Sequence, residues 1–134
     1  MKIVRIEQGQ EKFFANVAPG RILGLMSRPN AAAIGAVDEG KALGIMIFTL
    51  QGEESLTIEW LNVEQERREE GIGAQLIEQI FDIARYLDVK RVCVNLDQDN
   101  DFENMQLYLM NWGFNWQKNS LGRVELSSQR AAYC

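Results

Sequence analysis

Hydrophobic residues in the first half of the chain alternate with polar residues or form short apolar runs, a pattern typical of β-strands. Three such segments follow one another at 31–37, 41–50 and 54–63. The polar stretches 38–41 and 51–54 separate them, and each contains a glycine, which favours a tight turn. We therefore predict three consecutive antiparallel strands.

The spacing of the apolar residues changes to that of a helix after position 70. The residues that repeat at this spacing are Ile72, Leu76, Ile77, Ile80, Phe81, Ile83, Ala84 and Leu87. Polar residues occupy the opposite face, so we predict a helix over 72–87. An apolar segment at 91–96 follows, and the order strand, helix, strand predicts a parallel neighbour in the sheet.

Shorter elements are predicted before the three strands. We expect a strand at 2–6, a helix at 8–18 that Pro19 and Gly20 end, and a second short helix at 21–27. Three apolar residues at helical spacing support the first of these helices.

Further elements are predicted after the parallel strand. A helix at 102–112 is expected to end at Gly113, and a closing hairpin is expected from 114–118 and 122–127. Residues 128–134 carry no clear element, and we interpret them as a tail or as the start of a linker.

Composition places the chain among ordinary globular proteins. Its 134 residues are 46% hydrophobic and 25% charged, which suits one domain, assigned to 1–127. No apolar run approaches the roughly 20 residues of a membrane helix. The first six residues are too short and interrupted for a signal peptide, so we expect a cytoplasmic protein. The net charge is −5 and no segment forms a basic stripe, which argues against nucleic acid as a partner.

The absence of histidine from the sequence limits the chemistry that the chain can perform. Nucleophile systems that pair serine or cysteine with histidine are excluded. Two cysteines without histidine do not make an ordinary zinc site, and we expect no metal. Acid–base chemistry must therefore use carboxylates, tyrosine, cysteine, lysine, backbone groups or water.

The segment 66–74, between a predicted strand and the predicted helix 72–87, has the features of a phosphate-binding turn. A helix start offers N–H groups that lack helical acceptors and a partial positive charge, and small residues let an anion approach the backbone. Gly71, Gly73 and Ala74 are small, and Arg68 precedes them. Neither a P-loop nor a Gly-x-Gly-x-x-Gly fingerprint is present.

A purely structural interpretation of this segment stays open. The two glycines would then serve only turn geometry and close packing. Glu69 and Glu70 are unhelpful near a pyrophosphate unless they point into solvent, although they also suit the first turn of a helix.

The strand 58–63 followed by Arg68-Glu69-Glu70-Gly71-Ile72-Gly73 resembles the GCN5-related N-acetyltransferase (GNAT) family, whose motif is Arg/Gln-x-x-Gly-x-Gly/Ala. The predicted order of elements over 1–127 is also similar to that family. The resemblance implies an α/β acyl-CoA N-acyltransferase fold, in which about four helices flank a central mixed β-sheet. It also implies that acetyl-CoA binds where the strands 54–63 and 91–96 splay apart.

The resemblance further implies how the cosubstrate is held. The backbone of the fourth strand at Leu61, Asn62 and Val63 would bond the pantetheine arm as an added strand would. The pyrophosphate-binding residues would be Arg68, Glu69, Glu70, Gly71, Ile72, Gly73 and Ala74. An amine would attack the thioester directly without a covalent enzyme intermediate, and a backbone N–H would stabilise the oxyanion. The amine acceptor stays open, and the family is compatible with a monomer or a homodimer.

Glu59 is the candidate general base. By strict alternation, two sets of side chains in the third antiparallel strand face opposite ways: Leu56, Ile58 and Trp60 on one face, and Thr57, Glu59, Leu61 and Val63 on the other. Glu59 would then share a face with the proposed pantetheine-binding positions. The alternative is a solvated strand carboxylate, because the facing of a strand can slip by one residue.

Tyr108 is the candidate general acid, and Asn104 is a further candidate for cofactor binding. The family places its tyrosine four residues before a Gly-Phe pair, and that position is Leu109 here. Its usual asparagine position corresponds to Phe102. Because one residue on a helix is about 100°, Tyr108 as a core or surface residue is the competing interpretation.

Three functional hypotheses follow from the sequence. The first is acetyl transfer from acetyl-CoA to a primary amine. The second is a catalytically degenerate domain that binds CoA or acyl-CoA and regulates a larger protein. The third is an interaction domain in which the glycine-rich helix start has no ligand.

Overall fold

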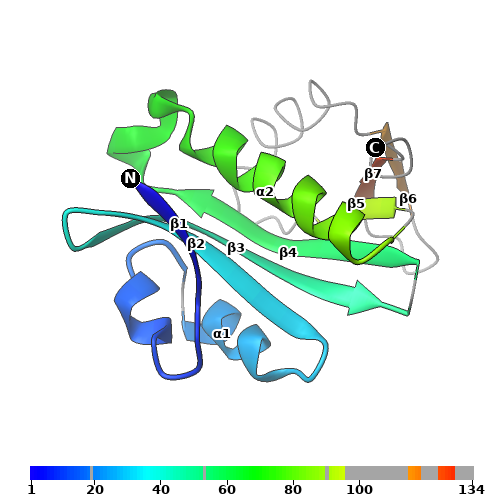
Figure 1. Ribbon diagram of the computed structural model, residues 1–134, viewed down its shortest axis with the longest axis horizontal. Coiled ribbons are helices and arrows are strands. Elements are labelled where there is room, and N and C mark those ends of the chain that lie inside the picture. The colour runs from blue at the N-terminus through cyan, green and yellow to red at the C-terminus, as the bar shows by residue number, and fades with distance from the viewer. Residues whose placement is uncertain (19, 53, 90, 96–114, 119–123, 129–134) are drawn as a thin grey trace.

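The computed structural model describes residues 1–18, 20–52, 54–89, 91–95, 115–118 and 124–128. A seven-stranded sheet in the order β1-β2-β3-β4-β5-β7-β6 forms its centre (Figure 1). The strands are β1 (Lys2–Arg5), β2 (Ala31–Asp38), β3 (Lys41–Gln51), β4 (Ser55–Val63), β5 (Arg91–Asn95), β6 (Asn115–Lys118) and β7 (Val124–Ser128). The helices are α1 (Gly20–Leu23) and α2 (Ile72–Tyr86), with 3₁₀ helices η1 (Glu11–Phe14), η2 (Gly24–Ser27) and η3 (Gln65–Glu70).

The pairing of the strands confirms the predicted mixed sheet. β2, β3 and β4 pair antiparallel in sequence, and β5 pairs parallel to β4 through Leu56 and Val92. The predicted hairpin at the C-terminal end is also present, because β6 pairs antiparallel with β7. β7 lies between β5 and β6, and it extends to Ser128, one residue beyond the predicted end of the hairpin.

The predicted helix at 8–18 is wrong, because this segment contains only the single 3₁₀ turn of η1. Gly9 has a positive φ of 96°, which breaks a regular helix at its start. One turn is enough to bury Phe14, and the hydrogen-bonded turns that follow it bury Val17 and Ala18. The 3₁₀ helix η3 was not predicted at all.

The predicted number of about four flanking helices is only partly matched. The described part of the chain contains the long helix α2 and the four-residue α1. The predicted helix at 102–112 lies outside the described residues. No helix in the described ranges is long and apolar enough to cross a membrane.

Each face of the sheet carries its own core. Helix α2 covers one face, and η1, α1 and η2 cover the other (Figure 1). Ile72, Leu76, Ile77 and Ile80 of α2 are almost completely buried against the first face. β3 is apolar along most of its length because both of its faces are covered.

A β-bulge interrupts the alternation of β4 at Glu59. Phe48 pairs with Ile58 and Ile47 pairs with Trp60, so Glu59 is one extra residue opposite β3. The side chains that pack on the α2 side are Leu56, Ile58, Leu61 and Val63, whereas Trp60 packs in the other core. The predicted grouping of Trp60 with Leu56 and Ile58 is therefore wrong, because it assumed strict alternation.

Candidate functional site

The C-terminal half of β4 extends beyond its pairing with β5. The parallel register runs from Ser55 to Ile58, which pairs with Val94, and β4 continues to Val63. At the end of β4, the Glu64 N–H donates to the Leu43 carbonyl at 2.8 Å. This half of the strand leads directly into η3 and the start of α2, so one continuous segment carries all the predicted cofactor-binding residues between 61 and 74.

The turn from η3 into α2 passes through Gly71. Gly71 has a left-handed backbone with φ 80°, and no side chain caps the helix that it begins. The first intrahelical bond is from the Gln75 N–H to the Gly71 carbonyl, at 3.1 Å. The N–H groups of Ile72, Gly73 and Ala74 therefore have no acceptor within the helix. The first turn also has no acidic side chain, so nothing in it offsets the partial positive charge of the helix start.

Burial of Ile72 and Leu76 fixes the direction in which the helix start points. Both side chains are at most 1% exposed and pack into the core between α2 and the sheet. Gly73 and Ala74, by contrast, are partly exposed. The helix start therefore presents small residues and backbone donors to its surroundings, as an anion site requires.

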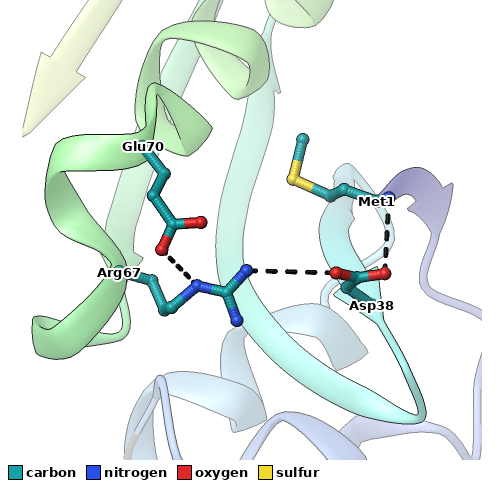
Figure 2. A network of polar contacts seen from close by, with 4 residues as sticks. All are labelled: Met1, Asp38, Arg67 and Glu70. Carbon is teal, nitrogen blue, oxygen red and sulfur yellow. Dashed lines mark hydrogen bonds and ion pairs between the residues drawn. The ribbon is translucent and has the colours of Figure 1, made fainter.

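Arg67 connects η3 with the turn between β2 and β3 (Figure 2). Its guanidinium is paired with the Glu70 carboxylate, and its Nη2 atom lies 3.9 Å from Asp38 Oδ2. The other Asp38 oxygen lies 3.4 Å from the amino group of Met1. The hydrogen bond to Glu70 is the main cause that raises the pKa of Arg67, and the charges of Glu70, Asp38 and Glu39 add to it.

This network changes the interpretation of Glu70. Its carboxylate is directed to Arg67, so its charge is offset by a cation of the same turn (Figure 2). Arg67 and Asp38 were not among the site residues predicted from the sequence. The two consecutive arginines were the visible signal, but Asp38 is 29 positions away and only the fold brings it near. The side chains of Arg68 and Glu69 lie outside the described residues.

The carboxylate of Glu59 is held by β3. The Thr49 hydroxyl donates to Glu59 Oε1 at 2.9 Å, and Gln51 Nε2 donates to the Thr49 hydroxyl at 3.1 Å. Phe48 and Leu50, the neighbours of Thr49, pack on the α2 side. Thr49 therefore faces the other side of the sheet, and the bulge directs Glu59 to that side as well. Glu59 does not share the side-chain face of Leu61 and Val63, contrary to the prediction.

The side chain of Asn62 has a structural contact. Asn62 Nδ2 and Trp60 Nε1 each donate to the Val17 carbonyl at 3.0 Å. These two bonds attach the segment after η1 to β4. The Nδ2 atom of Asn62 therefore points to the side of the sheet on which Trp60 packs.

Tyr108 and Asn104 lie outside the described residues, as do 96–103 and 105–114. Cys93 is buried and is not in a disulfide. No group of three or more acidic, cysteine or histidine side chains that fits a metal ion occurs within the described ranges.

Comparison with known proteins shows which family the chain is similar to. A family model described as "Acetyltransferase (GNAT) family" matches residues 4–114. Among curated proteins, none matches the sequence at a significant level.

Several solved structures share the fold. The ribosomal-protein-S18-alanine N-acetyltransferase of Escherichia coli superposes with a TM-score of 0.75 at 13% identity, covering 95% of this chain and 92% of that one. A GNAT family acetyltransferase of Elizabethkingia anophelis with acetyl-CoA bound has a TM-score of 0.73 at 16% identity, with coverages of 96% and 97%. The aminoglycoside 6′-N-acetyltransferase of Enterococcus faecium has a TM-score of 0.72 at 14% identity, with 96% of each chain covered.

Proposed function

Because the chain belongs to the GNAT acetyltransferase family, we propose that it transfers an acetyl group from acetyl-CoA to a primary amine. The observation that carries this proposal is the start of α2. It is uncapped, contains no acidic residue in its first turn, and follows β4 through the left-handed Gly71. A helix start of this kind binds phosphate oxygens through its N–H groups.

The residues of this chain fit the cosubstrate along one path. The backbone at Leu61, Asn62 and Val63 would hold the pantetheine arm in the manner of an added strand. The pyrophosphate would lie on the turn at 68–74, where Arg68 supplies a cation and the backbone of Glu69 to Ala74 supplies donors. Pairing of Glu70 with Arg67 supports this assignment, because it offsets the carboxylate that would otherwise repel the anion.

Acetyl-CoA, when bound, supplies an activated acetyl group: the amine nitrogen bonds to its carbonyl carbon, the C–S bond breaks, and CoA leaves as the thiol. The chain has to remove the proton of the attacking ammonium. Glu59 is the proposed acceptor of that proton, either directly or through water. Tyr108 is the proposed donor to the leaving sulfur, and Asn104 a proposed further contact to CoA.

The acceptor is proposed only as a primary amine. The similar protein of E. coli acts, by its name, on an alanine of a ribosomal protein, and that of E. faecium on an aminoglycoside. Both acceptors present an amine that must lose a proton before attack, and this shared chemistry is what the proposal carries over.

The first test is a calorimetric titration of the protein with acetyl-CoA, with CoA and NADH as comparisons. We expect micromolar binding of both CoA species and none of NADH. Gly73→Gln should abolish CoA binding, because a long side chain would occupy the space at the helix start. Gly20→Gln is the matched control, since a Cβ atom added at Gly20 meets nothing within 4 Å and the substitution should leave binding unchanged.

Turnover is then measured by release of the CoA thiol with a peptide that has an N-terminal alanine, an aminoglycoside and spermidine as acceptors. Thiol release that depends on one of these amines supports the transferase. Binding of acetyl-CoA without release in the presence of any amine would favour the CoA-binding regulatory module instead. Failure of both CoA species to bind would overturn the proposal.

A further inference from the structure

The β-bulge in β4 brings the Glu59 carboxylate within hydrogen-bonding distance of Thr49 on β3. Ile58 and Trp60 pair with neighbouring residues of β3, and Glu59, which lies between them on β4, has no Cα partner there. Bulges re-aim a side chain and are frequent beside active sites. The result here is a carboxylate that leaves the α2 side of the sheet and reaches Thr49.

Thr49 is a buried polar side chain with a defined contact. It is 1% exposed, one of three polar residues that are buried in the described part of the chain. A hydroxyl has one hydrogen to donate, and that of Thr49 goes to Glu59 Oε1. Gln51 donates to the same hydroxyl oxygen, so the bonds run in one direction from Gln51 through Thr49 to the carboxylate. Bonds aligned in this way polarise and strengthen one another.

The threonine is also stiff. A β-branched side chain in a strand has few χ1 rotamers, and burial removes the remaining freedom. Its hydroxyl therefore defines where Glu59 Oε1 lies. Because a carboxylate accepts up to about four hydrogen bonds, this contact is compatible with a further bond from an ammonium group or a water.

We propose that Thr49 is a positioning residue for the acetyl transfer, which orients the Glu59 carboxylate toward the amine through its hydroxyl. This inference rests on the proposed function and on the assignment of Glu59 as the base. Because the Thr49 side chain is buried, we expect it to touch neither substrate. It contributes by restricting the carboxylate to one orientation, and misplacement of a catalytic group by about 1 Å costs up to about a hundredfold in rate.

The chain offers a matched control in Thr57. It is the Cα partner of Thr49 on β4, is also buried, and makes no hydrogen bond with Glu59 among the described contacts. Removal of its hydroxyl tests the general effect of an apolar substitution at the same level of the sheet.

The experiment compares Thr49→Val, Thr49→Ser and Thr57→Val, with the most rapidly acetylated amine of the panel as acceptor. We expect Thr49→Val to lower kcat by at least about tenfold. The Kd for acetyl-CoA should be unchanged, because the lost hydroxyl acts on the base and not on the cosubstrate. Thr49→Ser keeps a hydroxyl and should retain most of the rate. Thr57→Val should have the rate of the unsubstituted protein.

The decisive measurement repeats Thr49→Val in the Glu59→Gln background. If Thr49 acts through Glu59, Thr49→Val should not lower the rate of the Glu59→Gln variant any further, since the base that Thr49 orients is already absent. An equal loss in both backgrounds, or full activity of Thr49→Val, would overturn the positioning role. If Thr49→Val does not fold, a rate of Thr49→Ser that is lowered as far as that of Glu59→Gln would also contradict it.

The transferase activity and the positioning role of Thr49 can be tested separately. Absence of acetyl-CoA binding or of any amine-dependent thiol release by the unsubstituted protein would overturn the transferase and this inference together. A working transferase that is insensitive to Thr49→Val would overturn only the role of Thr49.

Discussion

The ring of Phe14 lies directly on Gly35. A Cβ atom added to Gly35 would come within 2.3 Å of Phe14 Cε1 and 2.6 Å of Cζ, closer than such atoms approach in proteins. Phe14 belongs to η1 and Gly35 to the middle of β2. The contact explains how a single 3₁₀ turn docks tightly against β2.

Gly35→Ala is therefore expected to destabilise the protein. The methyl group must displace a ring that is 2% exposed, and overpacking of this kind costs about 1–3 kcal/mol. The free energy of unfolding from urea titration measures it. Gly24→Ala is the control, because nothing lies within 4 Å of an added Cβ there. Equal stability of the two variants would contradict the close contact.

The sequence predicted most of the fold because its strongest patterns are local. The continuous apolar strand β3, the amphipathic α2 and the glycine turns all show in short windows of sequence. The bulge at Glu59 could not be predicted, because the sequence around it alternates regularly. Only the structure shows that Ile58 and Trp60 pack in different cores. The helix predicted at 8–18 was wrong for a related reason, since the packing of Phe14 on Gly35 joins residues that are far apart in the sequence.

The candidate site also has a part that could be predicted from local sequence and a part that could not. The helix start after Gly71 is encoded by adjacent residues and could be predicted. The contacts from Thr49 to Glu59 and from Asp38 to Arg67 join separate strands and turns, and neither residue type is unusual at its position. Such partners become visible only when the register of the sheet is known.

Asn62→Ala is expected to lower stability and leave acetyl-CoA binding unchanged. Its amide nitrogen donates to the Val17 carbonyl, and loss of such a bond costs about 1 kcal/mol, whereas the proposed contact with pantetheine uses the backbone. Urea unfolding and calorimetry on the same sample separate the two effects. Asn30→Ala, which removes an exposed bond to the Leu50 carbonyl, is the comparison. A large loss of acetyl-CoA affinity in Asn62→Ala would assign its side chain to the cosubstrate.

The two consecutive arginines are expected to differ in their effect on CoA binding. Arg68→Gln should weaken CoA binding roughly tenfold, because the substitution removes one charge-assisted hydrogen bond to phosphate. Arg67→Gln should weaken it by less than about threefold, because Arg67 is paired with Glu70 and Asp38 at an exposed position. Calorimetry with CoA measures both. A larger effect for Arg67 would reverse the two assignments.

Gly71 and Gly40 make a matched pair that separates stability from binding. Both have left-handed backbones, with φ of 80° and 76°, and an added Cβ meets nothing within 4 Å at either position. Gly71→Ala and Gly40→Ala should each cost about 1 kcal/mol of stability, because a side chain is strained in this conformation. Gly71 begins α2 and orients its N–H groups, whereas Gly40 turns β2 into β3. Only Gly71→Ala should therefore weaken binding of CoA, and calorimetry beside thermal unfolding checks both values. Equal affinities of the two variants would mean that the geometry of the turn at Gly71 serves the fold alone.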